Sequence, residues 1–228
     1  KKAVVELYSG YLPENLNKRG RRPDLVVVGN VISANNAEAR AVIDGGLPYT
    51  SLPEAMERIL LKSTRNLVVA GTNGKTTTSS LLAHTLRYCG KDPSFFIGGV
   101  SLDLPDSFHV SDSPNALFVL EGDEYDTAFW DKVPKFNHYL PDDTILTSIE
   151  FDHADIYADL TAVERAFKGL TERIRTGGRL IACIDYDSVR KLLKALPPNG
   201  LPITTYGLTH APAYSVANAQ ARDGRQKF

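Results

Sequence analysis

The stretch NLVVAGTNGKTTTSSLLAHTLRY, residues 66–88, decides the fold of this chain. Residues 67–70 are a short apolar run of the kind that forms a buried strand. A glycine-rich segment, residues 71–76, follows, and apolar residues then recur at helical spacing over residues 77–88. The sequence therefore predicts a strand, a glycine-rich loop and a helix in direct succession.

This order of elements is typical of a site that binds a nucleotide phosphate. Glycines let backbone N–H groups approach phosphate oxygens, the helix N-terminus adds positive potential, and Lys75 adds a point charge. The Thr76 hydroxyl is placed to reach a magnesium ion. The match is incomplete, because Val69 stands where the G-x-x-x-x-G-K-[ST] pattern has its first glycine. We predict a phosphate site, in preference to a plain structural turn, at Gly71, Thr72, Asn73, Gly74, Lys75, Thr76 and Thr77.

The composition is that of an ordinary globular protein, with 228 residues, of which 43% are hydrophobic and 23% charged. The formal net charge of −1 gives no basic excess, so we predict no nucleic-acid partner. No apolar run approaches the roughly 18–20 residues of a membrane span, so we predict no membrane partner. Cys89 and Cys183 form no CxxC motif; we predict a reduced, cytoplasmic protein in which both cysteines lie in the core.

Residues 1–63 are predicted to form an α/β unit with a parallel sheet, because strands and helices alternate. One interpretation is a structural lobe. The other places a ligand at the carboxyl ends of the strands, near Gly29 and Asn30. Without a glycine fingerprint here, both stay open. The predicted strands are residues 3–7, 24–30 and 47–51, and the predicted helices are residues 37–43 and a segment that begins at Pro53.

An acidic run follows the apolar strand predicted over residues 116–120. Its carboxylates would repel one another unless a cation or solvent relieves them. A carboxylate at a strand end beside a phosphate loop is a common second anchor for magnesium. Glu121 is the first choice because it follows the strand directly, and we expect Asp123 and Glu124 to act indirectly. The alternative is a solvated acidic turn.

A second polar group follows the strand predicted over residues 144–149. His153 lies between Asp152 and Asp155 on a loop at the same edge of the sheet. An isolated histidine is usually structural, but flanking carboxylates suit a metal ligand that they orient. Further along, the sequence predicts helices over residues 160–174 and 187–196, and strands over residues 179–184 and 203–206. We expect residues 101–115 to be exposed loop.

Three motifs, in order along the chain, together resemble the Mur ligase family, whose members are ATP-dependent amide-forming enzymes of peptidoglycan synthesis and recycling. They are GTNGKTT at residues 71–77, EGDEYD at 121–126 and IEFDHAD at 149–155. The segments EYDTAFWDK at 124–132, KFNHY at 135–139 and EFDHADI at 150–156 are similar to one branch of the family. That branch joins UDP-N-acetylmuramate to L-alanyl-γ-D-glutamyl-meso-diaminopimelate, a murein tripeptide.

The resemblance implies an α/β fold with a domain order. Residues 1–63 would be a partial Rossmann-like domain that binds the UDP-sugar. Residues 64–228 would be a P-loop-type central domain that binds ATP on a mostly parallel sheet, truncated before its end. The third, C-terminal ligase domain of the family is absent. We therefore expect this chain to be a piece of a longer protein and not to catalyse the reaction alone.

The resemblance also implies a mechanism. The muramyl carboxylate attacks the γ-phosphate of ATP to give an acyl phosphate, and the peptide amine then displaces phosphate. Lys75 would neutralise developing charge, Thr76 and Glu121 would hold one Mg²⁺ ion, and His153 would help hold a second. Lys168 lies where some members carry a carbamylated lysine, although the branch named above often lacks a lysine there and a solvated helix lysine is the alternative.

Three other functions stay open at this point. One is the related UDP-N-acetylmuramate–L-alanine ligase of peptidoglycan biosynthesis. Another is a nucleotide-binding regulatory or structural fragment with no chemistry of its own, which the missing domains suggest. The third is a P-loop ATPase or kinase of a different family, and the Phe-Asp-His-Ala-Asp motif at residues 151–155 argues against it.

Overall fold

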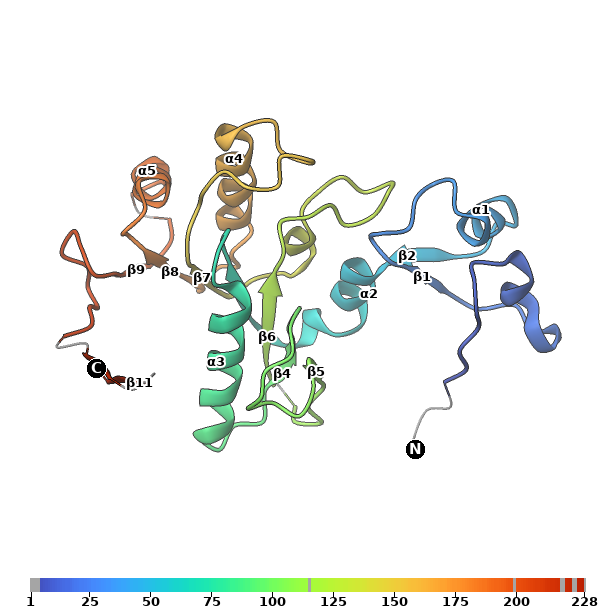
Figure 1. The fold of residues 1–228 in the computed structure, drawn as a ribbon, viewed down its shortest axis with the longest axis horizontal. Helices are drawn as coiled ribbons and strands as arrows, with labels where there is room; N and C mark the ends of the chain where they lie inside the picture. The colour runs from blue at the N-terminus through green and yellow to red at the C-terminus, as the bar shows by residue number, and fades with distance from the viewer. Residues whose placement is uncertain (1–4, 115, 199, 218–219, 223–224, 228) are drawn as a thin grey trace.

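The computed structural model of the protein describes residues 5–114, 116–198, 200–217, 220–222 and 225–227 (Figure 1). Strands and helices alternate along most of these residues. The strands are β1 Val26–Val28, β2 Tyr49–Ser51, β3 Arg65–Ala70, β4 Ser94–Phe96, β5 Phe108–His109, β6 Leu117–Gly122, β7 Asp143–Leu146, β8 Arg179–Cys183, β9 Ile203–Tyr206, β10 Gln220–Arg222 and β11 Arg225–Lys227. The helices are α1 Ala37–Asp44, α2 Leu52–Ile59, α3 Lys75–Tyr88, α4 Leu160–Glu172 and α5 Asp187–Ala195, with 3-10 helices η1 Pro13–Gly20, η2 Leu61–Ser63 and η3 Lys135–His138.

Seven of the described strands form the main sheet, in the order β5-β4-β6-β3-β7-β8-β9. β3 lies at the centre and pairs in parallel with β6 and β7. The pairing of β4, β8 and β9 is also parallel, whereas β5 runs antiparallel at the edge. The predicted α/β fold with a mostly parallel sheet is confirmed. Because parallel strands end at one edge of a sheet, the segments that follow β3, β6 and β7 gather there.

Apolar side chains cover both faces of this sheet. On one face, α3 contributes Ala83 to a small core that includes Phe95. On the other face, a larger core holds Phe136 of η3 and Phe167 of α4, whose ring centroids are 5.6 Å apart. Met56 of α2 belongs to this larger core. Helix α2 therefore packs with the main sheet, and the domain boundary between residues 63 and 64 stays a prediction.

The two strands of the N-terminal part, β1 and β2, form a separate parallel sheet. Val28 of β1 is 6% exposed, but Val27 is 47% exposed. The predicted buried strand over residues 24–30 is thus shorter and less buried than expected, because β2 is the one strand paired with it in the described structure. Residues 5–7 of the predicted first strand are irregular, and residues 3 and 4 lie outside the described residues.

Other local predictions need correction. Residues 101–115 are not wholly exposed loop, since β5 pairs with β4 there and Leu104 is buried. Cys183 is buried, but Cys89 is exposed because it follows the last turn of α3, where Tyr88 is exposed as well. Among the described helices, none combines the length and the apolar character that a membrane span requires.

Candidate active site

The phosphate loop joins the end of β3 to the start of α3 and depends on two glycines. Gly71 has φ +137°, and a Cβ added there would lie 2.1 Å from Thr147 Oγ1. Gly74, with φ +79°, is the N-cap of α3 and provides no side-chain cap. In the described structure nothing lies within 4 Å of a Cβ added at Gly74. The loop is therefore closely packed at Gly71 and open at Gly74, where uncapped helix N–H groups are available to an anion.

The loop is fixed to the segment that follows β7. The Thr72 N–H donates to the Ser148 carbonyl at 3.0 Å, and the Asn73 N–H donates to Ser148 Oγ at 2.9 Å. The Thr147 hydroxyl donates to the Asn73 carbonyl at 2.6 Å. The Asn73 side-chain amide donates to Glu150 Oε2 at 2.8 Å. These bonds hold the backbone of the loop in one shape before any ligand binds.

Thr76 and Glu121, the predicted magnesium pair, lie together beside the loop. The Thr76 hydroxyl donates to Glu121 Oε1 at 2.8 Å. The Gly98 N–H donates to Glu121 Oε2, also at 2.8 Å. Thr76 and Thr77 line a cavity of about 370 Å³ on this side of the loop. Hydroxyl and carboxylate oxygens are the donor type that Mg²⁺ prefers, so this pair fits the ion by its chemistry.

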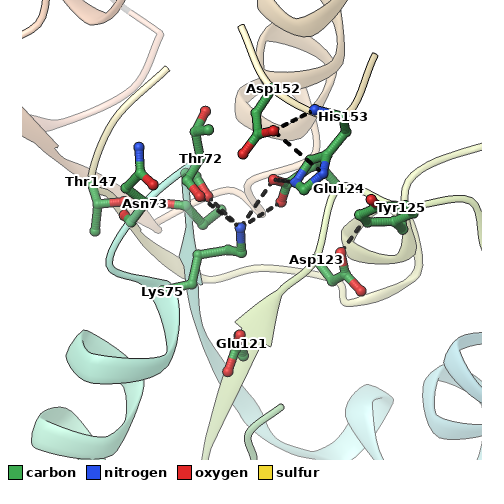
Figure 2. A network of polar contacts seen from close by, with 12 residues as sticks. Thr72, Asn73, Lys75, Glu121, Asp123, Glu124, Tyr125, Thr147, Asp152 and His153 are labelled. Carbon is green, nitrogen blue, oxygen red and sulfur yellow. Dashed lines mark hydrogen bonds and ion pairs between the residues drawn. The ribbon is translucent and has the colours of Figure 1, made fainter. Parts of the chain in front are cut away.

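Lys75 forms the centre of a charged group at the other side of the loop (Figure 2). Its Nζ donates to the carbonyls of Gly71 at 2.8 Å and Thr72 at 3.1 Å. It also donates to Glu124 Oε1 at 3.0 Å and lies at an ion-pair distance of 2.9 Å from Oε2. His153 Nε2 lies 3.0 Å from the same Oε1. The Glu124 side chain is 2% exposed, and a carboxylate so buried requires such partners.

The backbone and ring of His153 are held in place by neighbouring groups. His153 has φ +57°, and its N–H donates to Asp152 Oδ1 at 2.7 Å. The Tyr125 ring centroid is 4.4 Å from that of the imidazole. The Tyr157 hydroxyl donates to the Glu124 carbonyl at 2.7 Å. Burial, and then the Glu124 carboxylate, raise the pKa of Tyr157, so this hydroxyl keeps its proton and remains a donor.

Thr76 and Glu121, predicted to hold one Mg²⁺ ion, and His153, predicted to help hold a second, lie in two places in the structure. Thr76 contacts Glu121, whereas His153 contacts Glu124, and Figure 2 shows Glu121 apart from the Lys75 group. Within the described ranges, no group of three or more His, Cys, Asp and Glu side chains is arranged to hold a metal ion. The sequence predicted that Glu124 acts indirectly; in the structure it contacts both Lys75 and His153, and its role stays a prediction. The signal available was that Glu124 and His153 follow strands predicted at the same sheet edge.

Lys168 lies on α4 and has different surroundings. Its side chain is 53% exposed, and its Nζ is 3.5 Å from Glu172 Oε1 one turn further along the helix. Among the interactions of the described residues, none joins Lys168 to Lys75 or His153. Its catalytic role and carbamylation stay a prediction from the family resemblance.

Residues 69–228 match the family model described as the Mur ligase middle domain. The chain belongs to the Mur ligase family. The family prediction made from the three motifs is therefore confirmed. The matched range includes the phosphate loop, the acidic run at residues 121–126 and the segment around His153.

This Mur ligase chain is similar to curated ligases and to a solved ligase structure. It is 42% identical over 180 residues to the UDP-N-acetylmuramate–L-alanyl-gamma-D-glutamyl-meso-2,6-diaminoheptandioate ligase of Escherichia coli (strain K12), covering 79% of this chain and 38% of that protein. It is 36% identical over 182 residues to the UDP-N-acetylmuramate–L-alanine ligase of Streptomyces avermitilis, covering 80% of this chain and 37% of that protein. The chain thus spans less than two fifths of the length of these relatives. Its structure is similar to the UDP-N-acetylmuramate:L-alanyl-gamma-D-glutamyl-meso-diaminopimelate ligase from Neisseria meningitides, with TM-score 0.85 and 34% identity, covering 96% of this chain and 70% of that one.

Proposed function

We propose that the protein to which this chain belongs is an ATP-dependent ligase of peptidoglycan recycling. It joins UDP-N-acetylmuramate to L-alanyl-γ-D-glutamyl-meso-diaminopimelate through an acyl phosphate. The observation that carries the proposal is a Mur ligase phosphate loop whose lysine pairs with Glu124, which in turn contacts His153. The higher identity to the Escherichia coli tripeptide ligase, 42% against 36% for the L-alanine ligase, favours the peptide acceptor.

Residues 71–77 form the proposed site for the phosphates of ATP. The uncapped N-terminus of α3 supports it, because its N–H groups are free of side-chain caps. Thr76 and Glu121 would hold one Mg²⁺ ion, and His153 would help to hold a second. When bound, magnesium neutralises negative charge on phosphate oxygens. The oxygen donors of Thr76 and Glu121, 2.8 Å apart, are of the type that suits this ion.

In the proposed reaction, the muramyl carboxylate attacks the γ-phosphate of ATP and yields an acyl phosphate and ADP. The peptide amine then displaces phosphate and forms the amide. Lys75 would turn from Glu124 and the loop carbonyls toward the phosphoryl oxygens and neutralise their charge. Before ATP binds, Glu124 would hold the lysine at the site, and it would orient His153. Lys168 is the further catalytic residue proposed from the family resemblance.

The test is ADP release by the full-length parent protein with Mg-ATP and UDP-N-acetylmuramate. The acceptor is either L-alanine or the L-Ala-γ-D-Glu-meso-diaminopimelate tripeptide. We expect ADP release when the tripeptide is the acceptor and none when L-alanine is the acceptor. Release with L-alanine alone would instead assign the biosynthetic ligase, a candidate that the 36% identity to the Streptomyces avermitilis enzyme keeps in view. Release with neither acceptor would contradict a ligase and leave a nucleotide-binding protein without this chemistry.

The domain assignment belongs to the same proposal. Residues 1–63 would form part of the UDP-sugar domain, and residues 64–228 the ATP-binding domain. We also propose a cytoplasmic protein whose partners are its small-molecule substrates, with no nucleic-acid or membrane partner. A net charge of −1 supports the absence of a nucleic-acid partner.

A further inference from the structure

The segment from the end of β6 through η3, residues 123–138, is an ordered excursion from the main sheet that we name the strap. Asp126 and Pro134 form an antiparallel bridge across it. The Thr127 N–H and hydroxyl both donate to the Val133 carbonyl at 2.9 Å. The two sides of the strap are therefore bonded to each other.

The base of the strap holds Glu124 at the candidate active site. Lys135 Nζ lies 2.5 Å from Asp123 Oδ2, and the Lys135 N–H donates to the Tyr125 carbonyl at 3.0 Å. Phe136, which follows, is fully buried in the larger core. The position of Glu124 is thus set by the same bonds that close the strap.

The far part of the strap contacts the N-terminal elements. The Trp130 ring meets the Tyr49 ring of β2 edge-on, with centroids 4.9 Å apart. His138 Nδ1 lies 3.1 Å from Glu57 Oε2 of α2, and its Nε2 lies 2.8 Å from Asp131 Oδ2 within the strap. Figure 1 shows the strap, between β6 and β7, reaching toward β2 and α2. Besides the core that Met56 of α2 shares with Phe136, the His138 imidazole and the Trp130 indole therefore join the strap to α2 and β2.

We propose that the strap positions Glu124 relative to the N-terminal part, with His138 and Trp130 as positioning residues. The inference rests on the proposed function, in which residues 1–63 help to bind the UDP-sugar. The strap would then set the placement of the sugar carboxylate against the Lys75 group. Hydrogen bonds to charged carboxylates and an edge-on aromatic pair both resist displacement. Loss of either contact weakens productive binding of the UDP-sugar and leaves Mg-ATP binding at the loop unchanged.

The kinetic test uses the full-length protein with His138→Ala and with Trp130→Ala. Lys132→Ala is the matched control, because Lys132 lies in the same strap but forms an exposed ion pair with Asp126. We expect the KM for UDP-N-acetylmuramate to rise about tenfold in His138→Ala, the effect of one hydrogen bond to a charged group. In Trp130→Ala, which removes an edge-on aromatic pair, we expect a rise of about threefold to tenfold. The Mg-ATP dissociation constant and the Lys132→Ala kinetics should stay at the wild-type values. Glu57→Gln combined with His138→Ala should add little to His138→Ala alone, since both remove one contact.

Hydrogen exchange of the full-length protein supplies a readout that does not need turnover. In His138→Ala we expect faster amide exchange both at residues 49–51 and at residues 123–125, and not in α5. Exchange that stays at the wild-type rate in either segment would overturn the proposal, as would an equal loss of UDP-sugar and Mg-ATP binding. If the wild-type protein ligates no acceptor, the proposed function fails, while the exchange comparison still decides whether the strap couples the two parts.

Discussion

Two strand–loop–helix units in this chain differ at the N-terminus of the helix: a side chain caps the first helix, and none caps the second. In the first, β1 leads to α1, and the Asn36 side chain accepts hydrogen bonds from the N–H groups of Glu38 and Ala39, both at 3.0 Å. In the second, β3 leads to α3, where Gly74 provides no side-chain cap. A helix whose end is satisfied by its own chain offers no donors to an anion. The comparison favours the second unit as the phosphate site and a structural role for the first helix end.

The two units also differ in packing. Val68, Val69 and Ala70 at the end of β3 are fully buried, whereas Val27 in the middle of β1 is 47% exposed. β3 has a parallel neighbour on each side, and the loop after it is bonded to the exit of β7. Close packing therefore holds the loop after β3 in a fixed shape. Preorganised binding of a charged ligand requires such a fixed shape.

Lys75→Ala should have the largest effect on the second unit. It removes the charge that we propose to face the phosphate, and it takes one cationic partner from the buried Glu124. We expect ligation by the full-length protein to fall about 10³-fold, as for loss of a preorganised donor at a transition state. ADP release measures the effect, and Lys191→Ala, which breaks an exposed pair with Glu164, is the control. Unchanged ligation in Lys75→Ala would refute the proposed mechanism.

Alanine substitution of one glycine in each unit tests the packing difference. At Gly71 the new Cβ would lie 2.1 Å from Thr147 Oγ1, whereas at Gly29 it would lie 4.0 Å from Ile32 Cγ1. Gly71→Ala should destabilise the protein by about 3 kcal/mol, because overpacking adds to an unfavourable φ. Gly29→Ala should change stability by less than about 0.5 kcal/mol. Urea denaturation and Mg-ATP calorimetry of the full-length protein measure both, and similar losses from the two substitutions would show that the packing difference has no such consequence.

Asn36→Ala tests the capped helix itself. Two N–H groups of α1 lose their acceptor, so stability should fall by about 1 kcal/mol. Asn36→Asp keeps a side-chain acceptor and should remain close to the wild type. Urea denaturation gives the stability, and calorimetry should find Mg-ATP binding unchanged in both variants. Weaker Mg-ATP binding in Asn36→Ala would mean that the first unit takes part in the phosphate site.

The sequence was sufficient for features that depend on local pattern. Short apolar runs predicted β3, β6 and β7, and the glycine loop predicted the position of α3. The contact between His153 and Glu124 was not predictable in this way. It depends on the pairing of β6 and β7 with β3 and on the path that the chain takes after each strand. Glu121 follows the predicted strand directly but is itself within β6. Glu124 leaves the strand and reaches across the loop to Lys75 and His153.

Asp185, which follows β8, allows a further test of the contrast between filled and open N–H donors, and we expect its effect to be the smallest. Its carboxylate accepts the N–H groups of Leu208 and Thr209 at 2.8 Å and the Thr209 hydroxyl at 2.6 Å, so the donors of this turn are already filled. The Thr209 hydroxyl and then the two N–H groups hold the pKa of Asp185 below its usual value.

A folded-state pKa below the unfolded value means that the ionised carboxylate stabilises the fold above the unfolded pKa of about 3.9. This contribution is lost as pH falls through the folded pKa. The difference in urea midpoint between wild type and Asp185→Asn should therefore shrink from pH 7 toward pH 3, modestly because solvent screens the site. If the difference in urea midpoint between wild type and Asp185→Asn stayed constant at all pH values, the charge of Asp185 would not stabilise the turn. The contrast between filled and open N–H donors would then depend on α1 and α3 alone.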